Sequence, residues 1–253
     1  MQSYNATWWN YTYEGLADGD YNAKFFCNDT TGNFNMSSNV TFNVNAVADT
    51  NITACGTLNQ ANTYYVLTRN VSSTGTCFTI AANNITLDGQ GYWITHSKTK
   101  NNRDGINISN YNQTTIKNTF IKDSSSQSYS SGIYIDGYNK GTPLSTKIYN
   151  NTLMVYSDSG LGIYIVGSFD QGNDFYLEIS NNTIIIRDPG GSNGISYGIY
   201  QQAYLYSVTF SSNKIFSNET GTDVGTYSLM DLGLINNITI QNNNVTYLNK
   251  TCI

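Results

Sequence analysis

The chain has 253 residues and a formal net charge of −5, and only 11% of its residues are charged. This composition argues against nucleic acid as a partner, because there is no cluster of Lys and Arg to neutralise phosphates. The sequence also lacks the apolar run of roughly 20 residues that a membrane-spanning helix needs. Glu occurs three times, whereas Asn, Thr, Ser, Tyr and Gly dominate. We therefore expect an all-β fold.

Residues 1–47 read as a short β segment. A turn at 16–21 leads into a strand at 24–27, a Gly-Asn hairpin at 28–33 and an alternating strand at 40–44. The L-x-D-G-x-Y corner, the D-x-x-G-N hairpin and the T-F-x-V end resemble the last strands of immunoglobulin-like modules in microbial surface proteins. Such a sandwich needs about seven strands, and only three or four fit. Either the module continues upstream or a neighbouring subunit supplies the rest, so we expect exposed edges and self-association through residues 1–47.

Residues 48–55 read as a polar linker, and a distinctive run follows from Cys55-Gly56 to Gly91. This run reads C-G-x-L, then N-V-S-S-x-G-T-C-F-x-I and N-I-T-L-D-G-x-G. It resembles the opening of the pectin-lyase-like right-handed β-helices of archaeal and bacterial surface proteins, which carry parallel β-helix repeats. The resemblance covers about 55–250 and implies a β-helix domain over 48–253.

The resemblance also implies a cap over the open apolar end of the first coil. A disulfide between Cys55 and Cys77 would fasten that cap and would stabilise it by roughly 3 kcal/mol. Two separate buried thiols are the alternative. Spacing alone does not assign Cys27 and Cys252.

A pattern of about 31 residues returns five times between Gly105 and Val245. Each copy begins with Gly and an extended pair, and each ends on an Asn two residues before an apolar residue. A fixed period of this size signals a solenoid. The apolar, β-branched flanks fit strands, so each copy is one coil of a parallel β-helix of about six coils. The recurring Asn residues are Asn118, Asn151, Asn182, Asn213 and Asn243.

An Asn at each corner has a physical explanation. Asn tolerates left-handed backbone angles, and its side-chain amide can donate to the Asn of the next coil, which gives an internal ladder. In Asn150-Asn151-Thr152 and Asn181-Asn182-Thr183 the second Asn belongs to this ladder. The first is the acceptor of an N-glycosylation sequon and should point outward.

The sequence holds 16 such sequons, about twice the roughly eight that chance placement would give. Together with four cysteines they favour a secreted, N-glycosylated protein at the cell surface. The N-terminal residues show neither the basic nor the apolar region of a signal peptide, so we expect a processed chain or a fragment. The sequon residues are Asn5, Asn10, Asn28, Asn35, Asn39, Asn51, Asn70, Asn84, Asn107, Asn112, Asn150, Asn181, Asn218, Asn237, Asn244 and Asn249.

Pectin-lyase-like β-helices include lyases, galacturonases and esterases, but the galacturonase motif set is missing from this sequence. We expect His96, in a polar loop, to be solvated rather than catalytic. Among the charged residues, Asp170 and Asp174 in one loop, together with Arg187 and Asp188 in the loop of a neighbouring coil, are the candidate acid and base group. We assign no catalytic residue, no metal site and no cofactor. Ca²⁺ would enter only with lyase chemistry.

Four tyrosines occupy equivalent positions in successive copies: Tyr134, Tyr164, Tyr200 and Tyr227. We expect their rings to form an outward stack along one sheet, with coils about 4.8 Å apart. Such a strip can stack on sugar rings, or it can simply stabilise the sheet face. In the first copy the matching position is Asn107, a sequon.

The resulting hypothesis is an extracellular, N-glycosylated, adhesin-type surface module that is not an enzyme. It would be structural and would bind carbohydrate or other cell-surface molecules. One alternative is a pectin-lyase-like carbohydrate-active enzyme. Another is a structural subunit of an extracellular filament or surface layer.

Overall fold

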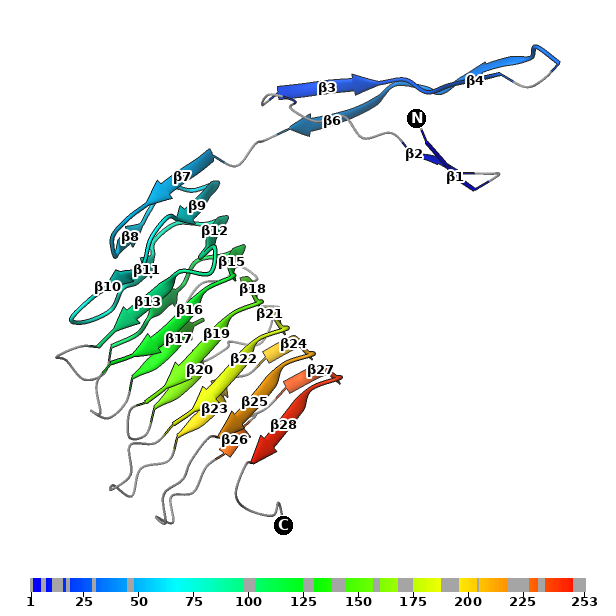
Figure 1. Cartoon of the computed structure of the whole chain (residues 1–253). Helices are drawn as coiled ribbons and strands as arrows, with labels where there is room; N and C mark the ends of the chain where they lie inside the picture. Colours follow the sequence, from blue (N-terminus) through cyan, green and yellow to red (C-terminus); the bar gives the residue numbers. More distant parts are fainter. Residues whose placement is uncertain are drawn as a thin grey trace. The chain divides into compact units, whose positions relative to one another are not determined.

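The chain divides into two compact units, Met1–Val47 and Ala48–Ile253. The computed structural model (Figure 1) describes the chain apart from a set of short segments. All regular elements of the described residues are strands. The segments outside the description are 1, 6–7, 11–15, 17–18, 29–30, 45–47, 98–102, 125–129, 138–143, 157–159, 168–174, 188–195, 204, 218–227, 232–234 and 248–253.

The second unit is a parallel β-solenoid whose coils pass in turn through three parallel sheets. Sheet 1 contains β8 (Gly56–Leu58), β11 (Phe78–Ile80), β14 (Ile106–Ser109), β17 (Ser131–Asp136), β20 (Leu161–Gly167), β23 (Tyr197–Ala203) and β26 (Ser228–Asp231). Sheet 2 contains β7 (Ala48–Ile52), β9 (Thr63–Leu67), β12 (Ile85–Asp88), β15 (Thr114–Lys117), β18 (Leu144–Tyr149), β21 (Phe175–Ser180), β24 (Leu205–Ser211) and β27 (Ile235–Gln241). Sheet 3 contains β10 (Val71–Ser72), β13 (Trp93–His96), β16 (Phe120–Asp123), β19 (Thr152–Val155), β22 (Thr183–Ile186), β25 (Lys214–Ser217) and β28 (Asn244–Tyr247).

The all-β parallel solenoid predicted from the repeats is therefore confirmed. Residues 48–52, expected to be linker, instead form β7 and pair in parallel with β9. The handedness and the number of about six coils stay predictions, because parts of several coils lie outside the described residues.

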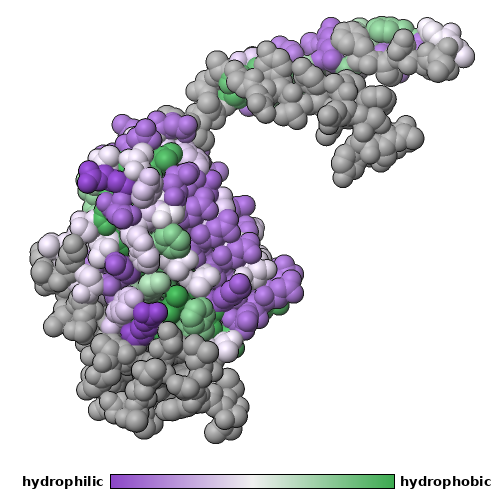
Figure 2. Space-filling model, viewed as in Figure 1, coloured by the Kyte–Doolittle hydropathy of each residue, from purple (hydrophilic) through white to green (hydrophobic). Residues whose placement is uncertain are grey.

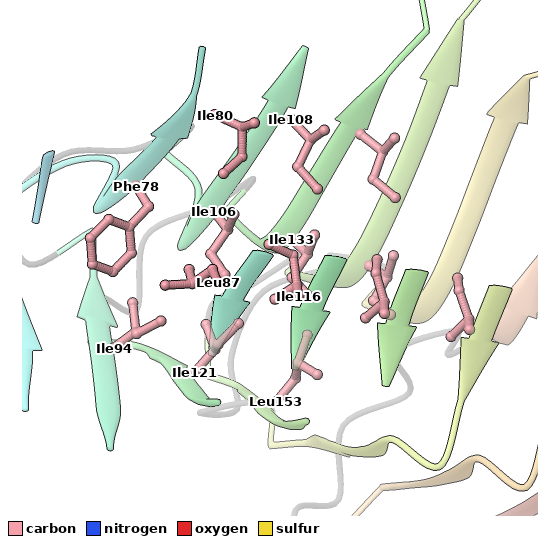
Figure 3. Packing of buried hydrophobic residues seen from close by; sticks show 14 of the residues in the cluster. Phe78, Ile80, Leu87, Ile94, Ile106, Ile108, Ile116, Ile121, Ile133 and Leu153 are labelled. Atoms are coloured by element: carbon pink, nitrogen blue, oxygen red, sulfur yellow. The ribbon is translucent and has the colours of Figure 1, made fainter. Parts of the chain in front are cut away.

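The core is a set of apolar columns, one along the inner face of each sheet. Alternate residues of a strand point to the same face, and the parallel register places equivalent residues of successive coils side by side. Figure 3 shows inward residues of several coils meeting between the strands. Each Ile removed from water in this way contributes roughly 1.5–3 kcal/mol. The columns include Ile106, Ile133, Ile163 and Ile199 in sheet 1, and Ile121, Leu153, Ile184 and Ile215 in sheet 3, all with essentially no exposure.

Close packing between coils explains the Gly that opens each of the first three repeats. A Cβ placed on Gly132 would lie 2.7 Å from the Gly162 carbonyl oxygen and 2.8 Å from Leu153 Cδ2. Gly105 and Gly162 meet the next coil in the same way. A side chain at these positions would force neighbouring coils apart.

The corner between sheets 2 and 3 carries the predicted internal ladder. Asn182 is buried, and its Oδ1 accepts hydrogen bonds from the backbone N–H and the side-chain amide of Asn151, both at 3.0 Å. Asn213 Oδ1 accepts the equivalent two hydrogen bonds from Asn182, and Asn243 Oδ1 accepts them from Asn213. The ladder therefore runs through four of the five predicted Asn residues.

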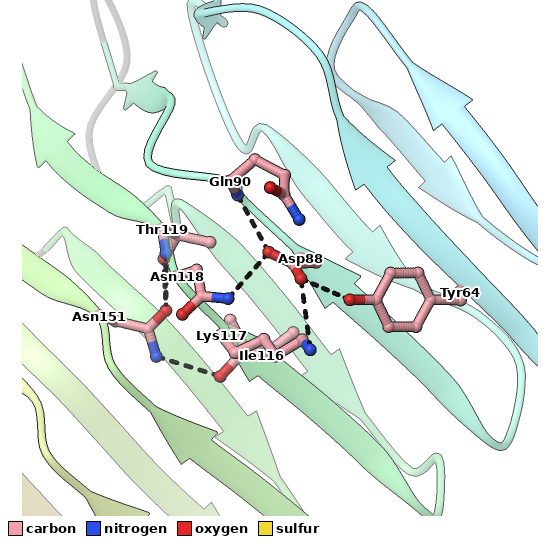
Figure 4. A network of polar contacts seen from close by, with 8 residues as sticks. All are labelled: Tyr64, Asp88, Gln90, Ile116, Lys117, Asn118, Thr119 and Asn151. Carbon is pink, nitrogen blue, oxygen red and sulfur yellow. Dashed lines mark hydrogen bonds and ion pairs between the residues drawn. The ribbon is translucent and has the colours of Figure 1, made fainter.

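Asn118 is not a ladder residue, contrary to the prediction. The register pairs Phe120 with Thr152, so the ladder position of this coil belongs to Thr119. The Thr119 backbone N–H and hydroxyl both donate to Asn151 Oδ1. Asn118 instead has a φ of 54° and donates to Asp88 (Figure 4).

The left-handed angle also lies one residue earlier than predicted. At this corner a residue with φ near +55° directly precedes each ladder position, and a short polar side chain with local hydrogen bonding suits this conformation. They are Asn118, Asn150, Asn181, Ser212 and Asn242. Asn150 and Asn181 are exposed, in agreement with the outward orientation predicted for them.

The N-terminal end of the solenoid carries a disulfide between Cys55 and Cys77, with a Cα–Cα distance of 4.7 Å. It joins the start of β8 to the start of β11, two neighbouring strands of sheet 1. The alternative of two separate thiols is therefore wrong. Cys27 lies in β4, and Cys252 lies outside the described residues.

The first unit consists of two-stranded antiparallel pairings. Its strands are β1 (Gln2–Asn5), β2 (Trp8–Asn10), β3 (Gly19–Ala23), β4 (Phe26–Asn28), β5 (Phe34–Met36) and β6 (Val40–Val44). Large apolar side chains are exposed on the described part of this unit, some of them green in Figure 2: Phe25, Phe34, Met36, Val40 and Phe42. The immunoglobulin-like character of the unit stays a prediction.

Candidate functional site

Three of the four predicted tyrosines form one column on the outer face of sheet 1. The register pairs Tyr134 with Tyr164 and Tyr164 with Tyr200. The ring centroids are 5.5 Å apart in the first pair, which meets edge to face, and 5.4 Å apart in the second, which is stacked. All three rings are half-buried, and the residues on either side of them in the chain are buried: Ile on both sides of Tyr134 and Tyr164, and Ile199 and Gln201 beside Tyr200. We call these three residues the tyrosine strip.

Tyr197 extends the strip at Tyr200, with ring centroids 4.4 Å apart and planes 20° from parallel. Sequence reasoning missed Tyr197, because it stands three residues before Tyr200 in the same strand rather than at the repeating position. The register places Asp231 of β26 beside Tyr200. Tyr227, which was predicted as the fourth rung, lies outside the described residues.

A polar cluster continues the column at the other end of the strip. Asn107 stands in register beside Tyr134. Its side-chain amide donates to Asp104 Oδ2 at 3.1 Å, and Ser109 Oγ donates to Asn107 Oδ1 at 2.7 Å. The structure thus places hydrogen-bonding groups in line with the aromatic rings.

Two carboxylates influence this end of the strip electrostatically. Burial raises the pKa of Asp104 above its ordinary value, although hydrogen bonds from Asn107 and Ser131 oppose the shift. The pKa of Tyr134 rises to about 12, because the ring is partly buried and the negative charges of Asp136 and Asp104 lie nearby. Its hydroxyl is protonated at neutral pH and is hydrogen-bonded to the Asp136 side chain. Sequence reasoning named neither carboxylate.

His96 is buried rather than solvated, which corrects the prediction for its loop. It is the last residue of β13 and is 1% exposed. Its Nδ1 lies 3.0 Å from Ser97 Oγ, and that hydroxyl donates to the Arg103 carbonyl at 2.8 Å. Burial lowers the pKa of His96 to about 4. An imidazole enclosed in this way is closed to a substrate.

Most of the candidate acid and base group lies outside the described residues. Asp170, Asp174 and Asp188 lie outside the described residues. Arg187 is exposed, and its guanidinium lies against the ring of Tyr156, 5.8 Å from the centroid. Among the described residues no group of three His, Cys, Asp or Glu is arranged to hold a metal ion.

A second polar cluster lies on sheet 2 (Figure 4). Asp88 is 2% exposed, forms an ion pair with Lys117 at 3.3 Å, and accepts hydrogen bonds from the Tyr64 hydroxyl, Asn118 and the Gln90 backbone N–H. Burial acts to raise the pKa of Asp88, but these donors outweigh it and hold the pKa below its usual range. The cluster joins three successive coils, so its role is structural.

The sequon residues differ in their surroundings. The exposed ones are Asn35, Asn39, Asn51, Asn70, Asn150, Asn181, Asn237 and Asn244. Asn84, Asn107 and Asn112 are less exposed. The side-chain amides of Asn84 and Asn107 donate to Asn62 and Asp104, and Asn112 Oδ1 accepts from the backbone N–H of Gln113 and of Ser145. Asn218 and Asn249 lie outside the described residues, as do the side chains of Asn5, Asn10 and Asn28.

The fold and the site define the class of protein as an all-β parallel solenoid with an aromatic strip on one sheet. Comparisons with protein-family models, curated proteins and solved structures find no match. None of the described elements is a helix of the length and apolarity that crossing a membrane requires.

Proposed function

We propose that this chain is an extracellular, N-glycosylated surface or adhesin-type module that binds carbohydrate and carries out no catalysis. Its solenoid would be a right-handed β-helix of the pectin-lyase-like class. The observation that carries the proposal is the column of Tyr134, Tyr164 and Tyr200 along sheet 1. Aromatic rings in line on a surface with few charges suit the apolar faces of sugar rings.

The polar groups around the strip support the same ligand class. The protonated Tyr134 hydroxyl and the Asn107 and Ser109 side chains supply donors and acceptors at one end of the strip. Sugar hydroxyls need such partners when they leave water. An extended glycan would lie along the solenoid axis, with rings on tyrosines and hydroxyls on the polar end.

The test is retention of the purified chain on a panel of polysaccharides, followed by titration of the one that binds. We expect Tyr164→Ala and Tyr200→Ala to weaken binding by about tenfold or more, since aromatic anchors dominate such sites. Tyr92→Ala is the matched control, because Tyr92 is an exposed tyrosine on the corner after β12. Unchanged affinity in both strip variants would leave the strip with a structural role only.

Glycosylation is tested by mapping N-glycans on protein secreted from eukaryotic cells. We expect occupancy at the exposed Asn150 and Asn181. We expect much less at Asn107, because glycan attachment needs the amide nitrogen that donates to Asp104. An unmodified chain would remove the support for a secreted glycoprotein.

A pectin-lyase-like enzyme is the second candidate, favoured by the two carboxylates near Tyr134. Asp104, with its raised pKa, would act as an acid and Asp136 as its partner. New reducing ends or unsaturated products in the retention assay, abolished by Asp104→Asn, would establish this function. Retention without product would favour the binding module.

A filament or surface-layer subunit is the third candidate, favoured by the exposed apolar side chains of the first unit. Phe25, Phe34 and Phe42 would pack against a second copy of the chain. Concentration-dependent assembly that disappears when residues 1–47 are deleted would support this candidate. A monomer at all concentrations would exclude it.

A further inference from the structure

The outer face of sheet 2 contains an open groove that is separate from the tyrosine strip. It crosses β18, β21 and β24 and has a volume of about 180 Å³. Its described lining consists of hydroxyl groups, one aromatic ring, one ion pair and a single aliphatic residue: Ser145, Thr146, Lys147, Tyr176, Leu177, Glu178, Ser207 and Thr209.

The ring in this groove has small neighbours on both sides. Tyr176 is 47% exposed, and the register places Ser145 beside it on one coil and Ser207 on the next. The hydroxyl groups of these serines line the same groove as the Tyr176 ring.

The charged pair in the groove is accessible. Lys147 and Glu178 stand in register on neighbouring coils, 3.4 Å apart, with 55% and 42% of their side chains exposed. The Lys117–Asp88 pair on the same sheet is only 20% and 3% exposed and is surrounded by further donors. The buried pair holds coils together, whereas the exposed pair can exchange partners with a ligand.

The charges of Lys147 and Glu178 balance, so the groove has no preference for a polyanion or a polycation. Its chemistry is that of a ligand with hydroxyl groups and an apolar ring face. We propose that this groove binds one residue of a neutral saccharide. The sugar ring stacks on Tyr176. Lys147 donates hydrogen bonds to the sugar hydroxyls, and Glu178 accepts hydrogen bonds from them. This site lies on a different sheet from the tyrosine strip and does not depend on it.

The test uses the unglycosylated full chain and neutral hexaoses of glucose, mannose and xylose, with an oligogalacturonate as the acidic probe. Binding is followed by amide NMR shifts during titration to millimolar concentrations. We expect a neutral sugar to shift the amides of β18, β21 and β24. We expect Tyr176→Ala to weaken binding at these amides by about tenfold and Tyr176→Phe to preserve most of it.

Two further variants distinguish binding in the groove from binding at the tyrosine strip and from loss of the fold. Tyr164→Ala should leave the sheet 2 shifts unchanged, and Glu178→Gln should weaken them while the melting temperature stays near that of the parent. If a neutral sugar shifts amides of sheet 2 but none of sheet 1, the tyrosine strip is refuted as a binding site and the groove proposal is retained. The groove proposal is overturned if no neutral sugar shifts sheet 2, if Tyr176→Ala binds as the parent does, or if the acidic probe binds there more tightly.

Discussion

The Asn ladder provides the sharpest test of what stabilises this solenoid, and Asn182→Ala is the variant to make. The Asn182 side chain forms four hydrogen bonds inside the protein. It accepts two from Asn151, and it donates to the Ile148 carbonyl at 2.8 Å and to Asn213 Oδ1 at 3.1 Å. The residue is 1% exposed, so water does not replace these bonds when they are lost.

The expected loss follows from that count. A neutral hydrogen bond contributes about 0.5–1.5 kcal/mol net, and a buried group left without a partner costs about 1–3 kcal/mol. Four bonds at about 1 kcal/mol each predict a loss of about 4 kcal/mol. This is a large share of the roughly 5–15 kcal/mol that stabilises a typical domain. We therefore expect Asn182→Ala to unfold at markedly lower urea concentration.

Hydrogen exchange adds a local measurement, which matters because repeat arrays need not unfold in one step. The Asn151 amide loses its acceptor in the variant and should exchange faster, whereas the Asn182 amide keeps Asn213 Oδ1. The control is Asn181→Gly, which removes an exposed side chain and keeps the left-handed angle accessible. A loss below about 1 kcal/mol, or equal losses in both variants, would refute the ladder as a main source of stability.

Three further predictions concern packing, covalent linkage and pH. Gly132→Ala should destabilise the protein by about 1–3 kcal/mol through overpacking, whereas Gly56→Ala should cost little because nothing lies within 4 Å of its added Cβ; equal urea midpoints would contradict this. Replacing Cys55 and Cys77 by Ser should cost about 3 kcal/mol in urea unfolding, for a separation of 22 residues; an unchanged midpoint would count against the cap. Burial lowers the pKa of His96 to about 4 in the folded state, against 6.5 when unfolded, so the free energy of unfolding should fall by about 3 kcal/mol as pH drops from 6.5 to 4. His96→Gln should reduce this dependence of stability on pH, and an unaltered dependence would contradict its assignment to His96.

Much of the fold was predictable because the core positions of a solenoid recur in every repeat of the sequence. Inward Ile residues, the Gly at each strand start and the corner Asn recur because each coil presents the same surface to the next. The repeat Gly residues were recognised without their reason, which is the carbonyl oxygen of the next coil at 2.4–2.7 Å from an added Cβ.

The wrong assignment of Asn118 to the ladder arose from the strand register between coils. The repeat period alone does not determine this register to within one residue. Counting from the apolar residue after the corner placed Asn118 in the ladder, because Phe120 appeared equivalent to Leu153. The strand pairing instead aligns Ile121 with Leu153, one residue later. A slip of one residue exchanges the inner and outer faces of a strand, and it therefore exchanged a ladder residue for an outward one.

The candidate binding surfaces were only partly predictable for a related reason. Inward positions must pack against the same partners in every coil, whereas outward positions are free to vary. The tyrosine strip was visible because it repeats over three coils. The sheet 2 column that runs Thr115, Lys147, Glu178, Thr209 changes at every coil. A binding surface of this second kind leaves no repeat in the sequence, because only the strand register brings its residues together. Asn107, in register with Tyr134, likewise departs from the tyrosine repeat.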